Sequence, residues 1–382
     1  MINRPHYSPI GLDAGARAMK AIQLVHTRAG PKIHAAASFP RLTPGEDLNA
    51  AEVLRAAHVL RRQGFVGNDV VVGIPTANML SGVLEIPARA PGAPPLPIDA
   101  IARQELARAC KKDANSIELA WWELPSASTG GSGVRGAQGA QAIALGCAHA
   151  DADTLLACFD PAVGAGLDVL AIDARPAAIA RACAPLASAS PNLTAVLDLG
   201  YGAAHILILS GSLLVYERTL AEASLRLLAS GVANQLATDD ALADYILRVI
   251  GCKPIDQITS PDGTVPTAIE QAEDARALVC AHADALAGEL RASMSYATRR
   301  FDASLSRVLL SGAGADIPGL ADRIGQRTGV EAVIARVDAL ALAPVPPNDI
   351  DPALLGPGST VALGLALHNA PVARAEKRGT DA

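Results

Sequence analysis

Two short turns carry the residues of this chain that could do chemistry together. The first holds Asp13 and Gly15, and the second, about half the chain away, holds Asp198, Gly200 and Gly202. Each turn follows an apolar run typical of a β-strand. Glycine has no Cβ, so backbone N–H groups can approach phosphate oxygens, and carboxylates bind magnesium, usually through water. The two turns therefore predict a site for nucleotide phosphates, with both aspartates as magnesium ligands through water.

Lys20 and a third turn complete this candidate site. Lys20 follows the first turn and would reach a phosphate as a point charge. Gly312, Ala313 and Gly314 come after a strand-like run and open a helical pattern, so an adenosine could lie against the backbone beside a helix N-terminus. Taken alone, an acidic-glycine turn is usually a hairpin, Lys20 a solvated residue, and the third turn a weak signal. The order of the three turns is what favours a nucleotide site.

Composition limits the classes of protein to which this chain can belong. With 382 residues, half of them hydrophobic, it is expected to fold as two lobes. A net charge of −6 without a basic cluster argues against nucleic acid as a partner. No apolar run reaches the roughly 18 residues of a membrane helix, and the first residues lack a signal-like apolar segment. We therefore expect a cytoplasmic protein without direct membrane insertion. Its six scattered cysteines predict neither zinc nor disulfides.

The predicted elements repeat once along the chain. Each half opens with a strand meander and continues into helices, which indicates a duplicated unit with mixed sheets. The strands predicted in the first half span 10–12, 19–26, 32–39, 69–74, 117–123, 142–146 and 169–172. Those of the second half span 195–199, 204–209, 213–220 and 307–311. Predicted helices span 46–63, 99–112, 151–165, 176–184, 225–235, 240–250, 269–297, 318–328 and 360–368.

The order of the three turns resembles the phosphate-1, phosphate-2 and adenosine motifs of the actin-like ATPase superfamily. From about residue 9 to residue 370, the chain is similar to the PilM family of type IV pilus assembly proteins. The similar segments are 10–15 with Lys20, 71–75, 85–87, 144–148, 165–167, 172–173, Arg218, 291–296, 310–312 and 360–367. The resemblance implies an α/β, two-lobed actin-like (ribonuclease H-like) fold with a small subdomain inserted in the first lobe.

The resemblance also implies domain boundaries. Lobe I would comprise residues 8–85, 168–194 and 358–370, with the inserted subdomain at 86–167. Lobe II would comprise residues 195–345. We expect a flexible loop at 126–139, a hinge at 87–97 and a disordered tail at 371–382.

The function implied is that of a cytoplasmic scaffold in a type IV pilus assembly platform. Such a protein binds the cytoplasmic tail of a PilN-like membrane partner, is recruited to the inner face of the cytoplasmic membrane, and takes ATP and magnesium as ligands. Self-association stays open. The nucleotide-binding residues implied are Asp13, Gly15, Ala16, Arg17, Lys20, Asp198, Gly200, Gly202, Gly312, Ala313 and Gly314. The alternatives are a small-molecule kinase or phosphatase, or a cytoskeletal or cell-division protein, of the same superfamily.

Departures from the family pattern weaken the expected ATP site. Ala16 and Arg17 stand where the family has hydroxyls, and Ala203 and Ala204 replace Ser or Thr in the second turn. A charge-assisted hydrogen bond to phosphate is worth about 1.5–3 kcal/mol, so two or three losses would weaken binding by orders of magnitude. Arg17 would either reach a phosphate or fill the slot. No clear water-activating Glu or Gln is present, so we expect at most a weak ATPase.

Overall fold

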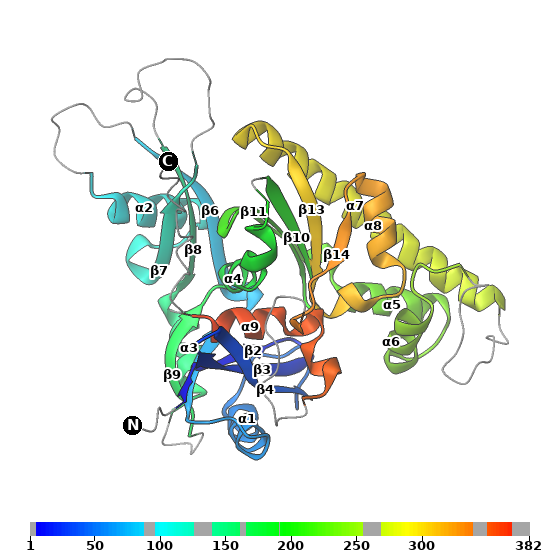
Figure 1. The fold of residues 1–382 in the computed structure, drawn as a ribbon, viewed down its shortest axis with the longest axis horizontal. Helices are drawn as coiled ribbons and strands as arrows, with labels where there is room; N and C mark the ends of the chain where they lie inside the picture. Colours follow the sequence, from blue (N-terminus) through cyan, green and yellow to red (C-terminus); the bar gives the residue numbers. More distant parts are fainter. Residues whose placement is uncertain are drawn as a thin grey trace, which may run out of the picture.

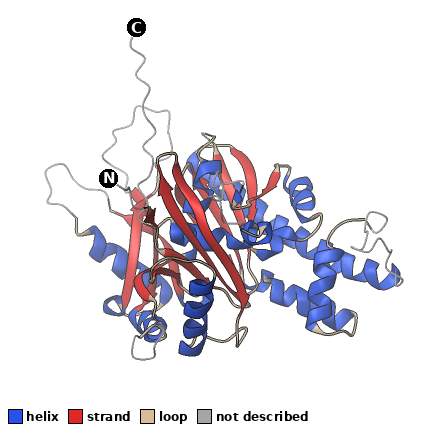
Figure 2. Ribbon diagram, turned by 60° about the horizontal axis from the view of Figure 1, so that its bottom comes forward, coloured by secondary structure: helices blue, strands red, loops and turns tan. Residues whose placement is uncertain are grey.

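The computed structural model describes residues 5–87, 96–125, 140–160, 166–190, 192–254, 269–338 and 350–368. The loop expected at 126–139, most of the hinge expected at 87–97 and the tail expected at 371–382 lie outside these residues. Within them, three β-sheets are surrounded by helices, as Figures 1 and 2 show. Two of the sheets share one topology, and the third belongs to a smaller unit.

The first sheet is built from the N-terminal meander. Strands β2, β3 and β4 are antiparallel, and β5 and then β9 join the β2 side in parallel. The short β1 also pairs with β3. These strands span Ile10–Ala14, Ala18–Thr27, Gly30–Pro40, Asp69–Gly73, Asp168–Asp173 and, for β1, His6–Tyr7. Runs of buried residues in β2, β3, β4 and β5 agree with the strands predicted there. Strand β9 was also predicted although it is only partly buried, and β1 was not predicted.

The sheet of the second half repeats this pattern. Strands β10, β11 and β12 form the meander, and β13 and then β14 join β10 in parallel. They span Leu193–Leu199, Ala204–Ser210, Leu213–Leu220, Leu305–Ser311 and Ala332–Ile334. Strand β10 thus has the position that β2 has in the first sheet. Asp13 on β2 and Asp198 on β10 therefore lie near the ends of equivalent strands.

A third sheet, of three strands, forms the smaller unit. The central strand β8 (Ala140–Ala148) is flanked by β6 (Met79–Ile86) and β7 (Ile117–Glu123). The sequence did not predict β6, and the predicted boundary between residues 85 and 86 falls inside it. This sheet also contacts the second lobe: Trp122 Nε1 donates a hydrogen bond to the carbonyl of Leu214 at 2.7 Å.

The helices follow the predicted order with shifted ends. From α1 to α9 they span Ala50–Arg62, Ile98–Cys110, His149–Ala157, Arg175–Ala187, Leu225–Gln235, Asp240–Val249, Ile269–Phe301, Leu320–Thr328 and Thr360–Ala366. The first was predicted to begin at Glu46, but Asn49 caps it and the preceding residues form a loop. The third was predicted to reach Ala165 and ends at Ala157.

Helix α9 lies at the centre of the molecule, between the first sheet and α4 (Figure 1). Two glycines permit this close packing. A Cβ on Gly11 of β2 would lie 2.1 Å from the carbonyl oxygen of Ala362, and a Cβ on Gly364 would lie 1.8 Å from that of Ala178. The closing helix therefore packs backbone to backbone against β2 on one side and α4 on the other.

Candidate functional site: a cleft between the two equivalent sheets

A cleft of about 990 Å³ opens where the turns of the two sheets face each other. Of the predicted site residues, those that line it are Asp13, Gly15, Ala16, Arg17, Lys20, Gly200, Gly202, Gly312 and Ala313. Asp198 is fully buried behind the wall, and Gly314 lies beneath it against Leu199 and Leu225. The structure thus brings the three turns together.

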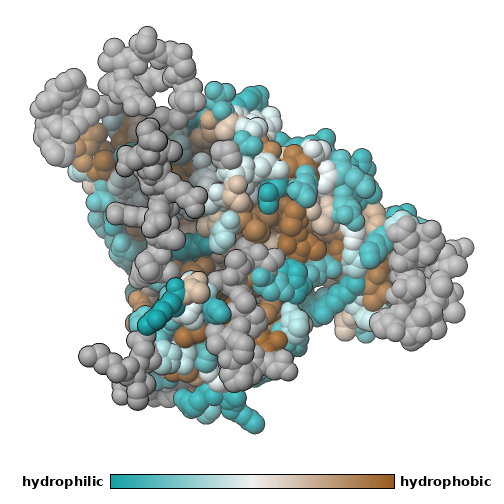
Figure 3. All heavy atoms as spheres, viewed as in Figure 1, coloured by the Kyte–Doolittle hydropathy of each residue, from teal (hydrophilic) through white to brown (hydrophobic). Residues whose placement is uncertain are grey.

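On the face of the molecule seen in Figure 1, hydrophobic residues gather near the middle and hydrophilic residues surround them (Figure 3).

Strand register explains which side chains meet at the acidic turns. In the first sheet, Asp13 stands opposite Lys20. In the second, Asp198 stands opposite His205 and beside Ser311, whose hydroxyl donates to Asp198 Oδ1 at 2.9 Å. Side chains paired across strands lie on the same face of a sheet, so each aspartate has fixed neighbours.

Arg175 joins the two aspartates, although no sequence pattern pointed to this residue. It is the first residue of α4, and its Nη1 donates to Asp13 Oδ1 at 3.0 Å while its Nε donates to Asp198 Oδ2 at 3.3 Å. The sequence separations are 162 and 23 residues. One guanidinium therefore holds the acidic turns of both sheets.

The charges at this bridge support one another. Burial disfavours a charged guanidinium, but Asp13 and Asp198 outweigh it and raise the pKa of Arg175. Burial likewise disfavours a charged Asp198, yet the charge of Arg175 contributes to keeping the pKa of this carboxyl below its usual range. The Arg175–Asp198 pair is therefore ionised on both sides at neutral pH.

The carboxylate oxygens are already largely occupied. Asp13 Oδ1 and both oxygens of Asp198 accept hydrogen bonds from Arg175 or Ser311, and Asp13 Oδ2 is buried without a partner. The described part of the chain contains no group of three or more acidic, His or Cys side chains suited to a metal ion. As arranged, the two carboxylates bind the guanidinium of Arg175 and do not fit a shared magnesium ion. Their role as metal ligands stays a prediction.

Lys20 contacts the segment that precedes α9. Its Nζ donates to the carbonyl of Gly358 at 2.7 Å, just before α9. Burial lowers the pKa of Lys20, and the nearby charge of Asp13 opposes this. A Cβ on Gly358 would lie 3.0 Å from the lysine nitrogen, so glycine makes room for the contact.

Arg17 closes the cleft between the lobes. Its Nη1 lies 2.5 Å from Asp244 Oδ1 on α6, and its guanidinium lies 5.4 Å from the centre of the Tyr201 ring. The position of a Cβ on Gly202 lies 3.5 Å from the Cβ of Ala16, which is ordinary van der Waals contact. The sequence left open whether Arg17 reaches a phosphate or fills the slot, and here it spans the slot to the opposite lobe.

The third turn differs from its prediction. Gly312 has φ of +80° and donates its N–H to the carbonyl of Pro357 at 2.9 Å. It opens a short 3-10 helix, Ala313–Asp316, and α8 begins only at Leu320. The helix N-terminus expected at this turn is therefore a single tight turn, because Pro318 and Gly319 interrupt the path to α8.

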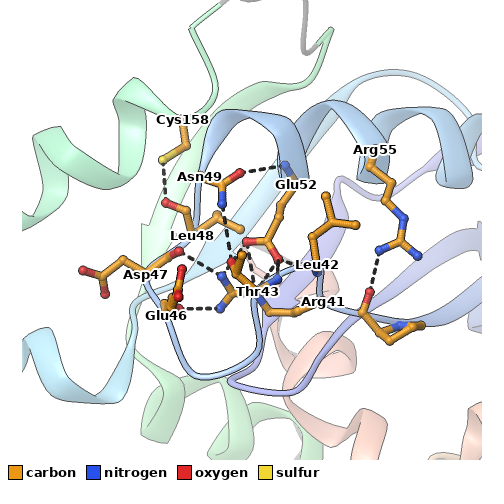
Figure 4. Close-up of polar contacts among 11 residues, drawn as sticks. Arg41, Leu42, Thr43, Glu46, Asp47, Leu48, Asn49, Glu52, Arg55 and Cys158 are labelled. Carbon is orange, nitrogen blue, oxygen red and sulfur yellow. Dashed lines mark hydrogen bonds and ion pairs between the residues drawn. The ribbon is translucent and has the colours of Figure 1, made fainter.

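The loop 41–49 forms a further wall of the cleft and is held by a buried ion pair (Figure 4). Arg41 and Glu52 are almost fully buried, and Arg41 Nε donates to Glu52 Oε1 at 3.0 Å. Burial disfavours the charged Glu52, but Arg41 and two backbone N–H groups lower its pKa. The N–H of Gly45 donates to the carbonyl of Ala16 at 2.7 Å, so the loop also fixes the first turn.

Comparison with solved structures confirms the predicted fold. A chain of a PilM–PilN type IV pilus biogenesis complex matches with a TM-score of 0.71 and 22% identity, covering 94% of this chain and 98% of that chain. A diol dehydratase-reactivating factor in nucleotide-free form matches with 0.53 and 12%, covering 95% and 99%. MreB 5 of Spiroplasma citri bound to AMPPNP matches with 0.50 and 11%, covering 97% of both. The sequence matches no family model and no curated protein. The chain thus has the actin-like ATPase fold.

Proposed function

We propose that this actin-like chain is a scaffold of a type IV pilus assembly platform and binds the cytoplasmic tail of a PilN-like membrane protein. The observation that carries this proposal is the match to the chain of the PilM–PilN complex. The alignment covers almost the whole length of both chains. Its TM-score of 0.71 exceeds the TM-scores of 0.53 and 0.50 for the other two structures. Recruitment to the inner face of the membrane would come from the partner. None of the described helices is long and apolar enough to cross a bilayer.

The tail would bind as an added β-strand. Among the described strands, β9 pairs only with β5, so its other edge offers free backbone hydrogen-bonding groups. Leu170 on β9 is 59% exposed, the largest exposure among the large hydrophobic side chains that the structure describes. An extended peptide gains affinity from main-chain hydrogen bonds and specificity from contacts with such side chains.

ATP would act as a structural ligand of this scaffold. The cleft offers Lys20 and the two glycine turns for phosphates, but Ala16 adds no hydroxyl. The side chain that lies between the two acidic turns is Arg175. A guanidinium cannot accept a proton from an attacking water at neutral pH. The arrangement therefore favours binding over hydrolysis.

A binding experiment with the tail peptide tests the scaffold. The purified chain and a peptide with the sequence of the partner's cytoplasmic tail are combined, with and without Mg-ATP, and binding is measured by pull-down and calorimetry. We expect a specific complex. If no binding occurs in either condition, the proposal is wrong.

A matched pair of variants tests the binding edge. Leu170→Asp places a charge on β9 and is expected to abolish tail binding. Leu242→Asp makes the same change on α6, where Leu242 is 48% exposed, and is expected to bind as the wild type does. Thermal unfolding first establishes that both variants are folded. Equal tail binding by the two variants would exclude β9 as the binding edge, but it would not contradict the proposal that the chain binds the tail.

A further inference from the structure

The position of Arg175 is electrostatically unusual. As the first residue of α4, it places a positive charge where the helix dipole favours a negative one. Among the described residues, its ion-pair partners are the carboxylates of Asp13 and Asp198, which compensate for this placement. We propose that Arg175 takes the place of the magnesium ion expected beside the phosphates, an inference that rests on the nucleotide role proposed above. The cleft would bind a nucleoside triphosphate free of metal.

Geometry supports this exchange of an ion for a side chain. Arg175 Nη1 and Nε bridge the two aspartates, which come from opposite lobes. A magnesium ion held through water would place its water ligands against these carboxylates, where the guanidinium already lies. Ser311 occupies another oxygen of Asp198, which leaves Asp13 Oδ2 alone without a hydrogen bond. The bridge that a metal would form is therefore already made by the protein.

Arg175 also keeps donors for a phosphate. The guanidinium carries five N–H donors, and the contacts to the aspartates come from Nε and Nη1. Its Nη2 donates to no described residue, and the side chain, 17% exposed, lines the cleft. Arginine binds phosphate through paired donors, so a free edge facing the cleft suits a phosphoryl oxygen.

Charge balance points the same way. Arg175 forms ion pairs with both Asp13 and Asp198, and Lys20 stands opposite Asp13 in the strand register, so two basic side chains already face the two carboxylates. A magnesium ion beside the guanidinium would instead be repelled. Metal-free ATP carries its full negative charge and would meet Arg175 and Lys20 directly.

Calorimetric titration of the wild-type chain with ATP tests the proposal, once with magnesium and once with EDTA. We expect Kd values that agree within about threefold, which corresponds to less than about 1 kcal/mol. ATP binding that is at least about tenfold tighter with magnesium would overturn the proposal. Absence of ATP binding in both conditions would overturn it too.

Variants at position 175 give a readout that does not depend on ATP. Manganese binding is measured by electron paramagnetic resonance, after thermal unfolding has shown that each variant folds. Wild type and Arg175→Lys are expected to bind no manganese in the cleft. Arg175→Gln removes the charge and is expected to gain a manganese site that disappears when Asp13→Asn is added. Should Arg175→Gln fail to fold, the wild-type measurements still decide.

Failure of this inference differs from failure of the scaffold proposal. Manganese binding by the wild type that is lost in Asp13→Asn would restore the metal site and leave tail binding unaffected. Absence of tail binding would end the scaffold proposal without changing the metal dependence of ATP binding.

Discussion

At the scale of residues, the cleft is governed by one ionic bridge that joins the two lobes. Asp198 is fully buried, yet it carries its charge because Arg175 and Ser311 contact it directly. A buried ion pair contributes little net stability, but removing one partner leaves an uncompensated charge. The sequence identified both aspartates and missed Arg175, because a spacing pattern does not show where a side chain from a distant helix will point.

The stability of the fold should therefore depend on pH through Asp198. Burial raises its pKa, but the charge of Arg175 contributes to a net lowering, so the folded chain binds this proton less tightly than the unfolded chain. The stabilisation is complete above the unfolded pKa of about 3.9 and is lost as pH falls through the lower folded value. We expect the free energy of unfolding, measured with urea, to fall more steeply below about pH 4 in the wild type than in Asp198→Asn. Parallel curves would contradict this assignment.

At the scale of elements, loops and helix contacts fix the walls of the cleft. The loop 41–49 is held by Arg41, which contacts Glu52 and the carbonyls of Glu46 and Asp47 at 2.9 and 3.0 Å. The sequence predicted a helix through part of this loop, from residue 46 onward. The buried guanidinium of Arg41 instead donates to the carbonyls of Glu46 and Asp47, and the helix begins only at Ala50, capped by Asn49.

Arg41→Ala is expected to release the loop. It leaves Glu52 buried without its partner, which costs about 3–5 kcal/mol, and it should raise hydrogen exchange across 42–48. Arg55→Ala is the matched control, because Arg55 contacts only the carbonyl of Pro40 among the described hydrogen bonds and does so at the surface. Mass spectrometry of exchange in both variants measures the difference. Equal protection of the loop in the two would show that Arg41 does not hold it.

The closing helix depends on its glycine. Gly364→Ala would place a methyl group 1.8 Å from the carbonyl oxygen of Ala178, so α9 or α4 must move. We expect a loss of at least about 3 kcal/mol in the free energy of unfolding, since backbone cannot relax as a side chain does. Gly288→Ala on α7 meets nothing within 4 Å and should be neutral or stabilising by up to about 1 kcal/mol. Chemical unfolding of both variants compares them, and similar stabilities would contradict the close packing.

At the scale of the whole molecule, the two lobes share one hydrophobic core cluster and also make polar contacts across the cleft. Arg175 joins them at the base, and Arg17 joins them at the opening through Asp244. The Arg17–Asp244 pair is partly exposed, at 42% and 20%, so its effect on stability should be below about 1 kcal/mol. Its role is to hold the lobes in register.

Arg17→Ala is thus expected to widen the cleft with little loss of stability. Spectroscopic labels on α1 and α6 would report a broader distance distribution in this variant, whereas Arg248→Ala should leave it unchanged. Arg248 contacts the same Asp244 but from within the same lobe. High salt should broaden the wild-type distribution, because a partly exposed ion pair is screened. An unchanged distribution in Arg17→Ala would show that other contacts set the opening.

The sequence by itself determined the duplicated strand order, the two acidic turns and the resemblance to the actin-like fold. These features depend on local patterns: apolar runs, glycine turns and the spacing of Asp13 and Asp198. Tertiary structure alone decided what lies between the turns. Arg175, Arg17 and the loop 41–49 reach the cleft because distant elements pack against one another, and no periodicity records such a contact. The same aspartates that suggest a metal site in the sequence therefore bind an arginine in the folded chain.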